Sequence, residues 1–384
     1  MRILHLVKTS DGASWAERQM RELVNIGYDI HAVLPGKGKL IDKYIKDKIK
    51  IHFLDLNVSI KESYKIPFLV SKLKKLIKEI KPDIIHSHFV ITTLIARVAL
   101  RNERIPLLFQ VPGPLHLENP IISRLEIFTS RKYDFWCGSS NWIKDKYIKL
   151  GICRSRVFYS PYVPDESRFV PMNKILARTK LGFDANIKLI GMIAYFYPPR
   201  VFLGHTRGIK GHEDFIDAIY LCLKKRKDIK AVIVGGPYKK KGVRYMEKLK
   251  KYALEKCGEN IIFLGERNDI PLLLACLDIA VVPSISENYG GTGEALLMEI
   301  PTIATSVGGI PEIIKPGETG FIVPPRSPKS ICNQILNILE NEEMAKKIAS
   351  QARKYVLANY NLKNAAKQIS QLYDYIIRYC NYYH

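Results

Sequence analysis

The sequence predicts an α/β protein of two doubly wound domains that face each other across a cleft. Three observations support this fold class. Short apolar runs alternate with helical patterns along the 384 residues, which is the βαβ rhythm of a parallel sheet covered by helices. The rhythm occurs twice in tandem, in a chain longer than one hydrophobic core can serve. The proline-rich segment 161–171 separates the two series.

The first series opens with the apolar run 2–7, followed by a turn at Gly12 and a helical pattern that stops at Gly27. Continuous apolar runs are typical of strands that are buried on both faces of a parallel sheet. The predicted elements of this half are strand 2–7, helix 15–26, strands 30–34 and 51–54, helix 68–81, strand 83–86, helix 92–100 and strand 107–111.

The second series begins at residue 188 and has the same rhythm. Its predicted elements are strand 188–194, helix 212–227, strand 231–234, helix 243–256 and strands 261–264, 279–282, 302–305 and 321–323. The tail 365–379 has helical spacing and can cap either half. We expect an N-terminal acceptor domain of residues 1–165, completed by a tail, 366–384, that crosses back to it. The C-terminal donor domain would then comprise residues 166–365.

The composition describes a basic protein without an evident membrane anchor. Lysine and arginine number 60 against 37 acidic residues, giving a formal charge of +23. Such a surface attracts phosphate esters, nucleic acid or anionic membranes, although it can also serve solubility alone. The apolar stretch 270–285 is too short and too interrupted to span a bilayer. The seven scattered cysteines suit reduced thiols in a cytosol. We expect a cytoplasmic protein, soluble or peripheral at the inner face of the membrane.

The segment 283–295 carries the most chemical information. Its glycines Gly290, Gly291 and Gly293 precede a predicted helix, where backbone N–H groups attract anions such as phosphate. Glu287 and Glu294 bracket these glycines, and carboxylates repel phosphate but accept hydrogen bonds from hydroxyls. A phosphate between two polyol-binding acids describes a sugar nucleotide. The alternative is a glycine-rich turn in which Glu294 serves only the helix N-terminus.

This segment and 301–312, together with 234–237 and 263–270, resemble the signature of the family-4 retaining glycosyltransferases of the GT-B fold. The resemblance implies that Glu287 contacts the donor sugar as a catalytic residue and that Glu294 binds the ribose. It further implies that the backbone at Gly290, Gly291 and Thr292 approaches the donor sugar and phosphates, and that Leu264 borders the base.

Three positions depart from the family pattern. Glu287 and Glu294 are seven residues apart, whereas the family usually spaces its two acids by eight. Glu299 stands where the family has a glycine. Met192 stands where the family has an arginine after the first strand of the second half, so one phosphate-binding cation is missing there.

Lys210 precedes a glycine at a predicted helix start, where its ammonium can meet a pyrophosphate. The family has a lysine at this place, so we expect Lys210 to stabilise the leaving diphosphate. Arg200 or Arg207 can supply the cation that Met192 lacks. The alternative for each of these residues is an ordinary solvated surface side chain.

Histidines and a glycine are the candidates in the first half. His116 follows strand 107–111 and can donate to a sugar hydroxyl or stabilise charge, unless it is only a core or surface histidine. The family often has a histidine in this loop. The pair His86 and His88 is interpreted as structural, because no third metal ligand lies near it in the sequence. Gly12 would let the backbone of the first loop approach the donor or the acceptor.

These observations predict a metal-independent glycosyltransferase. The chain contains no Asp-X-Asp motif, the carboxylate pair with which many such enzymes hold a metal ion, so cations and amides would neutralise the leaving group. The donor would be UDP- or GDP-linked, with no other cofactor. The acceptor would be a lipid-linked or saccharide hydroxyl in cell-surface polysaccharide or glycolipid assembly.

Two other functions stay open: a sugar-nucleotide epimerase of the same fold, and a non-catalytic polyanion-binding protein. Nucleic acid is an unlikely ligand, because aromatic and basic residues do not interleave. The segment 68–81 reads as a basic amphipathic helix that can lie on anionic lipid. The alternative is an ordinary sheet-packing helix with a solvated lysine face.

Overall fold

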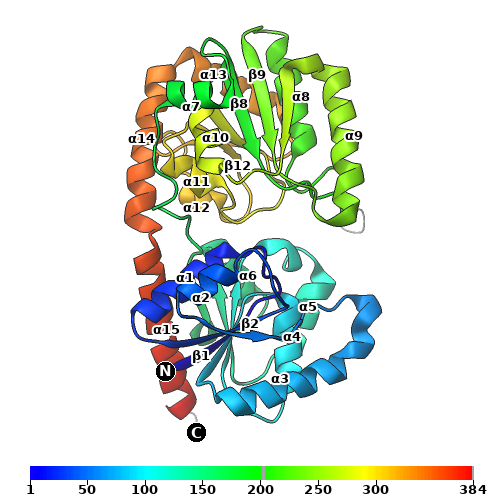
Figure 1. Ribbon diagram of the computed structural model, residues 1–384, viewed down its shortest axis with the longest axis vertical. Helices are drawn as coiled ribbons and strands as arrows, with labels where there is room; N and C mark the ends of the chain where they lie inside the picture. The colour runs from blue at the N-terminus through cyan, green and yellow to red at the C-terminus, as the bar shows by residue number, and fades with distance from the viewer. Residues whose placement is uncertain (201–203, 383–384) are drawn as a thin grey trace. The chain divides into compact units, whose positions relative to one another are not determined.

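The computed structural model describes residues 1–200 and 204–382, with Ile60 described in its backbone only (Figure 1). The chain forms two compact units. Unit 1 comprises Met1–Val163 and Leu362–His384, and unit 2 comprises Pro164–Asn361. The boundaries lie two and four residues before the predicted ones. The second boundary lies earlier because the last helix already begins at Leu362. Residues 383–384 of the predicted tail lie outside the described part.

Unit 1 contains a seven-stranded parallel sheet in the order β3-β2-β1-β4-β5-β6-β7. Its strands are β1 (Arg2–Leu6), β2 (Asp29–Leu34), β3 (Lys50–Phe53), β4 (Ile84–Ser87), β5 (Leu107–Val111), β6 (Asp134–Gly138) and β7 (Val157–Tyr159). Its helices are α1 (Ser14–Asn25), α2 (Ile41–Lys46), α3 (Ile66–Ile80), α4 (Val90–Ala99), α5 (Pro120–Phe128), α6 (Asn141–Lys149) and α15 (Leu362–Tyr382).

The helices of unit 1 cover both faces of its sheet. Strand side chains alternate between two apolar clusters, as the period of two requires. Ile3 and Phe135 pack on the face covered by α1, α2 and α15. Leu4 and Trp136 pack on the face covered by α3, α4 and α6. The tail helix α15 belongs to unit 1, as expected, and buries Ile369, Leu372, Tyr373 and Ile376 against it.

Unit 2 contains a six-stranded parallel sheet in the order β10-β9-β8-β11-β12-β13. Its strands are β8 (Lys188–Ile193), β9 (Ile229–Val234), β10 (Ile261–Gly265), β11 (Ile279–Val282), β12 (Thr302–Thr305) and β13 (Phe321–Val323). Its helices are α7 (Lys174–Leu181), α8 (His212–Leu223), α9 (Lys239–Cys257), α10 (Ile270–Cys276), α11 (Thr292–Leu297), α12 (Ile310–Ile313), α13 (Pro328–Glu340) and α14 (Glu342–Asn359).

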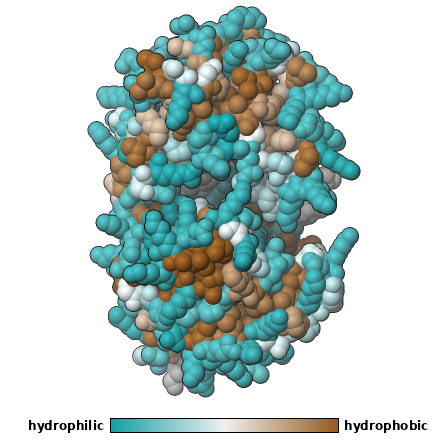
Figure 2. Space-filling model, in the orientation of Figure 1, coloured by the Kyte–Doolittle hydropathy of each residue, from teal (hydrophilic) through white to brown (hydrophobic). Residues whose placement is uncertain are grey.

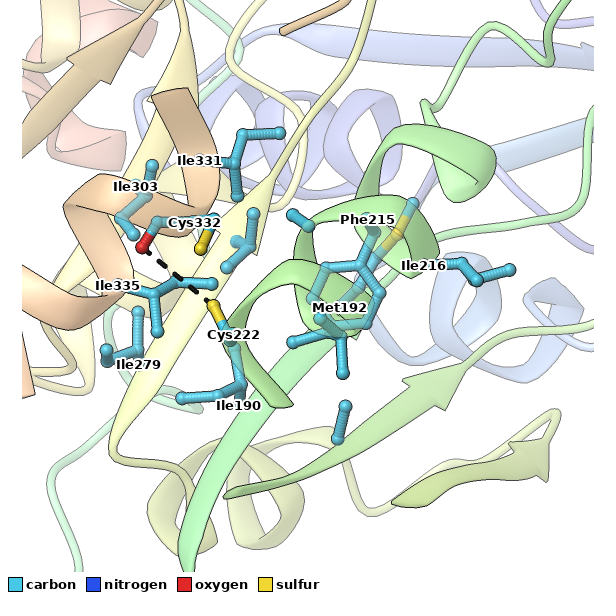
Figure 3. Close-up of a cluster of buried hydrophobic side chains, with 14 of the residues drawn as sticks. Ile190, Met192, Phe215, Ile216, Cys222, Ile279, Ile303, Ile331, Cys332 and Ile335 are labelled. Atoms are coloured by element: carbon cyan, nitrogen blue, oxygen red, sulfur yellow. Dashed lines mark hydrogen bonds between the residues drawn. The ribbon is translucent and has the colours of Figure 1, made fainter. Parts of the chain in front are cut away.

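The core of unit 2 explains one departure from the family pattern. Met192 at the end of β8 is only 1% exposed and packs beside Phe215 of α8 (Figure 3). A charged side chain would be costly among these residues. Cys222 of α8 and Cys332 of α13 meet in the same cluster, where the Cys222 thiol lies 3.8 Å from the Cys332 carbonyl oxygen.

Each sheet has one point at which the strand order reverses, between β1 and β4 in unit 1 and between β8 and β11 in unit 2. Ligands of doubly wound sheets bind beyond the carboxyl ends of the strands at such points. The loops after β8 and β11 contain Lys210 and the glycine-rich segment 283–295. The sheet topology therefore brings together two segments that lie about 75 residues apart in the sequence.

Two surface features bear on function. Within the described residues, the helices are all too short or too polar to span a membrane. Large apolar side chains are nevertheless exposed on unit 1, and Figure 2 shows hydrophobic patches there among hydrophilic residues.

Candidate functional site

A pocket of about 310 Å³ lies at the β8–β11 switch point of unit 2. Loops after four parallel strands form it, as the sheet topology requires. Its lining includes four residues predicted from the sequence: Lys210, Glu287, Gly291 and Glu294. The rest of its lining is Met192, Ile193, Ala194, Tyr195, Tyr197, Val234, Gly235, Gly236, Glu266, Arg267, Ile270, Val281, Val282, Pro283 and Ser284.

Lys210 and Glu287 form an ion pair in this pocket. Both side chains are largely buried, at 20% and 13% exposure, so the pair is only partly screened by water. The Lys210 ammonium also lies 5.9 Å from the centre of the Tyr197 ring. The predicted phosphate-binding cation and the predicted sugar-binding carboxylate are thus adjacent. An anionic ligand can attract Lys210 while hydroxyls of the same ligand bind Glu287.

Glycines make this approach possible. Gly211 has φ +73°, and a Cβ there would lie 2.0 Å from the carbonyl oxygen of Pro283. Gly290 has φ +49°, and a Cβ there would lie 2.7 Å from the Glu287 carboxyl carbon. Positive φ is costly for residues with a Cβ. The two glycines therefore let the Lys210 loop and the glycine-rich turn close around the ion pair.

The three residues predicted to contact the donor through their backbone, Gly290, Gly291 and Thr292, differ in their surroundings. Gly291 lines the pocket, whereas Gly290 is exposed outside the lining. Thr292 is fully buried, and its N–H donates to the Tyr289 carbonyl oxygen at 3.1 Å. That N–H already has an intramolecular acceptor, so Gly291 is the better placed of the predicted backbone contacts.

Three predicted residues, Arg200, Arg207 and Leu264, lie outside the pocket lining. The Arg207 guanidinium contacts Asp214 at 2.6 Å and Asp217 at 2.8 Å, which ties it to α8. Arg200 is partly exposed and is not a lining residue. Leu264 lies within β10, also outside the lining. The arginine that does line the pocket is Arg267.

Sequence reasoning missed Glu266 and Arg267. Both follow β10 directly and line the pocket. Glu266 lies beside Gly236, where a Cβ would be 3.0 Å from the Glu266 carboxylate, and Arg267 pairs with Asp269 at 2.6 Å. Their position at the carboxyl end of a predicted strand was the signal that could have identified them.

Tyr197 is a further lining residue that sequence reasoning did not select. Burial raises the pKa of its hydroxyl, and Tyr238 and Glu287 reinforce the shift. The phenol therefore stays protonated at neutral pH and can donate a hydrogen bond to a ligand.

The first-half candidates lie in unit 1. The His116 ring lies 2.8 Å from the Tyr147 hydroxyl, measured from its Nε2 atom, and burial lowers the pKa of His116 to about 4. The imidazole is therefore neutral at pH 7. The Gly12 N–H donates to the Thr9 hydroxyl at 3.3 Å, and a Cβ there would make only ordinary contacts. The left-handed residue of this turn is Ala13, with φ +63°.

The structure corrects the premise that His86 and His88 lack a third partner. Because β1 lies beside β4, His5 joins them in a fully buried cluster. The His5 Nδ1 atom lies 2.9 Å from His88 Nε2. His86 and His88 each contact a hydroxyl through Nδ1, that of Tyr373 at 2.6 Å and that of Tyr162 at 2.5 Å.

The cluster forms a hydrogen-bonded network. The His88 ring stacks on those of His5 and His86 at interplanar angles of 12° and 27°, whereas the His5 and His86 rings are tilted by 35°. One ring nitrogen of each histidine lies within 4.8 Å of the others, a spacing at which the three could hold a metal ion. Burial lowers the pKa of His88 to about 3 and holds the pKa values of His5 and His86 well below their usual range. All three imidazoles are neutral at pH 7.

Two protein-family models match the chain. The family described as "Glycosyltransferase Family 4" matches residues 13–162 in unit 1. The family described as "Glycosyl transferases group 1" matches residues 200–355 in unit 2. Together the two models cover most of the chain.

Full-length relatives are similar at low identity. The N-acetyl-alpha-D-glucosaminyl L-malate synthase of Bacillus anthracis is 22% identical over 370 residues, 93% of this chain and 92% of that protein. The UDP-Gal:alpha-D-GlcNAc-diphosphoundecaprenol alpha-1,3-galactosyltransferase of Escherichia coli is 24% identical over 369 residues, 91% and 90% of the two chains. The solved structure of Anabaena HepE in complex with UDP and glucose matches with a TM-score of 0.80 and 20% identity, over 97% of this chain and 99% of HepE.

The histidine cluster predicts acid-sensitive stability of unit 1. An unfolded histidine has a pKa near 6.5. Below that pH the histidine is protonated in the unfolded chain, whereas buried His88 stays neutral in the folded chain. Stability is complete above pH 6.5 and is lost as the pH falls, by about 1.4 kcal/mol per pH unit for one such histidine. Between pH 6.5 and 5.5, where the unfolded histidine goes from half to nearly full protonation, wild type should lose about 1 kcal/mol of unfolding free energy relative to His88→Gln.

Urea unfolding followed by tryptophan fluorescence measures this difference, because Trp15, Trp136 and Trp142 all lie in unit 1. Other titrating groups, such as Glu17 with its pKa raised to about 7 by burial, are common to both proteins. An equal pH dependence of the two proteins would contradict the buried neutral state of His88.

Proposed function

The chain belongs to the family-4 glycosyltransferases of the GT-B fold, and we propose that it transfers a sugar from a nucleotide-sugar donor to a hydroxyl acceptor with retention at the anomeric carbon. One observation carries the proposal. The switch-point pocket of unit 2 gathers a lysine, a glycine turn and two glutamates, which are the groups that a sugar diphosphate requires.

Each group has a role in this proposal. Lys210 and the Gly291 backbone neutralise the charge that develops on the leaving diphosphate, without a metal ion. Glu287 binds hydroxyls of the transferred sugar, and Glu294 binds the ribose. Preorganised groups of this kind stabilise the transition state because they need no reorganisation during the reaction. The donor phosphate itself is the base that takes the acceptor proton, as proposed for enzymes of this family.

The relatives support a uridine nucleotide and a lipid-linked acceptor. HepE was solved with UDP, and the name of the E. coli enzyme states UDP-galactose and a diphosphoundecaprenol acceptor. We therefore favour a UDP-linked over a GDP-linked donor, and a place in cell-surface polysaccharide or glycolipid assembly. Such an acceptor implies peripheral attachment at the inner face of the membrane.

The structure narrows the contribution of the basic helix to that attachment. Most apolar residues of α3, including Leu69, Leu73 and Ile77, pack in the unit 1 core, whereas Phe68 at its beginning is exposed. That apolar face cannot insert into lipid while the unit is folded. The exposed lysines of α3 can still provide electrostatic attraction to anionic headgroups.

Lys210→Ala should lower turnover about 100-fold, the usual effect of removing one preorganised charge-stabilising donor, ~3 kcal/mol of barrier. Steady-state release of nucleoside diphosphate measures it, with Lys240→Ala, an exposed lysine of α9, as the control. Unchanged turnover in Lys210→Ala would remove this lysine from the site. Formation of an epimer from donor alone would instead favour an epimerase.

Glu294→Ala should raise the KM for the donor, because the ribose hydroxyls lose a charged acceptor that is worth about 1.5–3 kcal/mol. Donor KM at saturating acceptor is the measurement. A variant with an unaltered donor KM would contradict the ribose assignment.

Gly290→Ala should weaken donor binding at least tenfold, because the new Cβ would displace the Glu287 carboxylate. Gly317→Ala is the matched control: its φ is +77°, but the added Cβ would meet no atom within 4 Å. The control should lose about 1 kcal/mol of stability through backbone strain alone and keep its donor affinity. Titration calorimetry with a UDP-sugar compares them, and equal affinities would count against the role of the turn.

A further inference from the structure

The short helix α5 of unit 1 presents its apolar side to solvent. Ile121 is 79% exposed, Leu125 50% and Phe128 88%, and Ile122 beside them is 38% exposed. These positions fall on one side of a helix, since they repeat at intervals of three to four residues. Arg124 lies exposed among them. A soluble helix normally places such a stripe against its own core.

The opposite side of α5 is polar and buried. Ser123 is 2% exposed and Glu126 is fully buried. The Glu126 carboxylate accepts hydrogen bonds from Arg97 of α4 at 2.7 Å and from the Trp136 indole of β6 at 3.0 Å. Arg97 also contacts Asp134 at 2.7 Å. The helix is thus anchored to the sheet by a buried ionic network, together with Ile127, which packs against the apolar cluster around Trp136.

This network fixes the rotation of α5. Turning the helix by half a turn would bury its apolar stripe, but it would also take the Glu126 carboxylate away from Arg97 and from the Trp136 indole, leaving Arg97 with Asp134 alone. Breaking a buried ion pair is strongly destabilising. The fold therefore holds the four apolar side chains on the surface, where a binding partner can cover them.

Charge indicates what that occupant is. Helix α3 lies on the same face of the sheet as α4 and exposes Lys72, Lys74, Lys75 and Lys78. Acidic residues on this side are fewer. Glu79 faces Lys75 at 3.9 Å and Glu62 pairs with Lys65 at 2.7 Å, while Glu103 lines a pocket with Lys74 and Lys78, and Glu118 lies exposed just before α5. An apolar stripe on the same face of the sheet as a cluster of lysines complements a surface with anionic headgroups over hydrocarbon.

We propose that the exposed face of α5 is a membrane-docking surface that inserts Ile121, Leu125 and Phe128 into an anionic lipid leaflet, while the lysines of α3 attract the headgroups. This inference rests on the proposed peripheral location and deepens it. It does not depend on the donor chemistry in unit 2.

Flotation of the full chain with vesicles tests the proposal. Wild type should bind vesicles that contain phosphatidylglycerol and should not bind pure phosphatidylcholine. Leu125→Gln with Phe128→Ser should reduce binding at least tenfold. The matched control, Ile175→Ser with Leu176→Gln, removes two comparably exposed apolar residues, 66% and 69%, from α7 of unit 2 and should bind like wild type.

Three outcomes would overturn the proposal: no binding by wild type, undiminished binding by the α5 variant, or an equal loss in the α7 variant. Light scattering tests the alternative that a second copy of the chain covers this face. If wild type is a dimer and Leu125→Gln with Phe128→Ser is a monomer, the face is a protein interface. Binding of UDP is measured in parallel and should be equal in all variants. Its absence in a wild type that binds vesicles would contradict the proposed donor site and leave the docking surface intact.

Discussion

The contact between Lys210 and Glu287 is the one on which the proposed donor site depends. It joins a loop that follows β8 to a turn that follows β11, and it forms because these strands are neighbours at the switch point of the sheet. Two glycines with positive φ remove the atoms that would hold the loops apart. In the pocket the two opposite charges pair with each other. A ligand that carries both a diphosphate and hydroxyl groups can take the place of each partner, with the diphosphate binding Lys210 and the hydroxyls binding Glu287.

The sequence predicted the strands well because buried parallel strands leave an unmistakable apolar pattern. Strands 107–111, 279–282, 302–305 and 321–323 have the predicted bounds. It missed β6 and β7 and several helices, namely α2, α5, α6, α7, α10, α12, α13 and α14. Strand β6 has only three apolar residues, between Asp134 and Gly138, and α5 has its polar residues inside. Hydrophobic periodicity shows that a helix has an apolar and a polar side. It cannot show that the buried Arg97–Glu126 pair directs the apolar side of α5 to solvent.

The site was predicted where residues are close in sequence and less well where tertiary contacts decide. Lys210, Glu287, Gly291 and Glu294 come from segments with a local signature, and all line the pocket. Arg207 was predicted from its charge, but it pairs with Asp214 and Asp217, which lie in the first two turns of α8. The sequence could not identify His5 as a neighbour of His86, because only the pairing of β1 with β4 brings the two residues together. Glu299 in place of a glycine adopts the glycine-like φ of +57°, so that substitution leaves the local backbone unchanged.

The central claim is that the pocket of unit 2 binds the diphosphate of an activated sugar. Differential scanning calorimetry with uridine, UMP, UDP and a UDP-sugar tests it most directly. At one fixed concentration, the account predicts a smaller stabilisation by uridine than by UDP and the UDP-sugar, which should reach about 2.7 kcal/mol at a concentration of 100 times Kd. Equal stabilisation by uridine and UDP would show that the diphosphate is not what the pocket holds, and no stabilisation by any nucleotide would contradict the account as a whole.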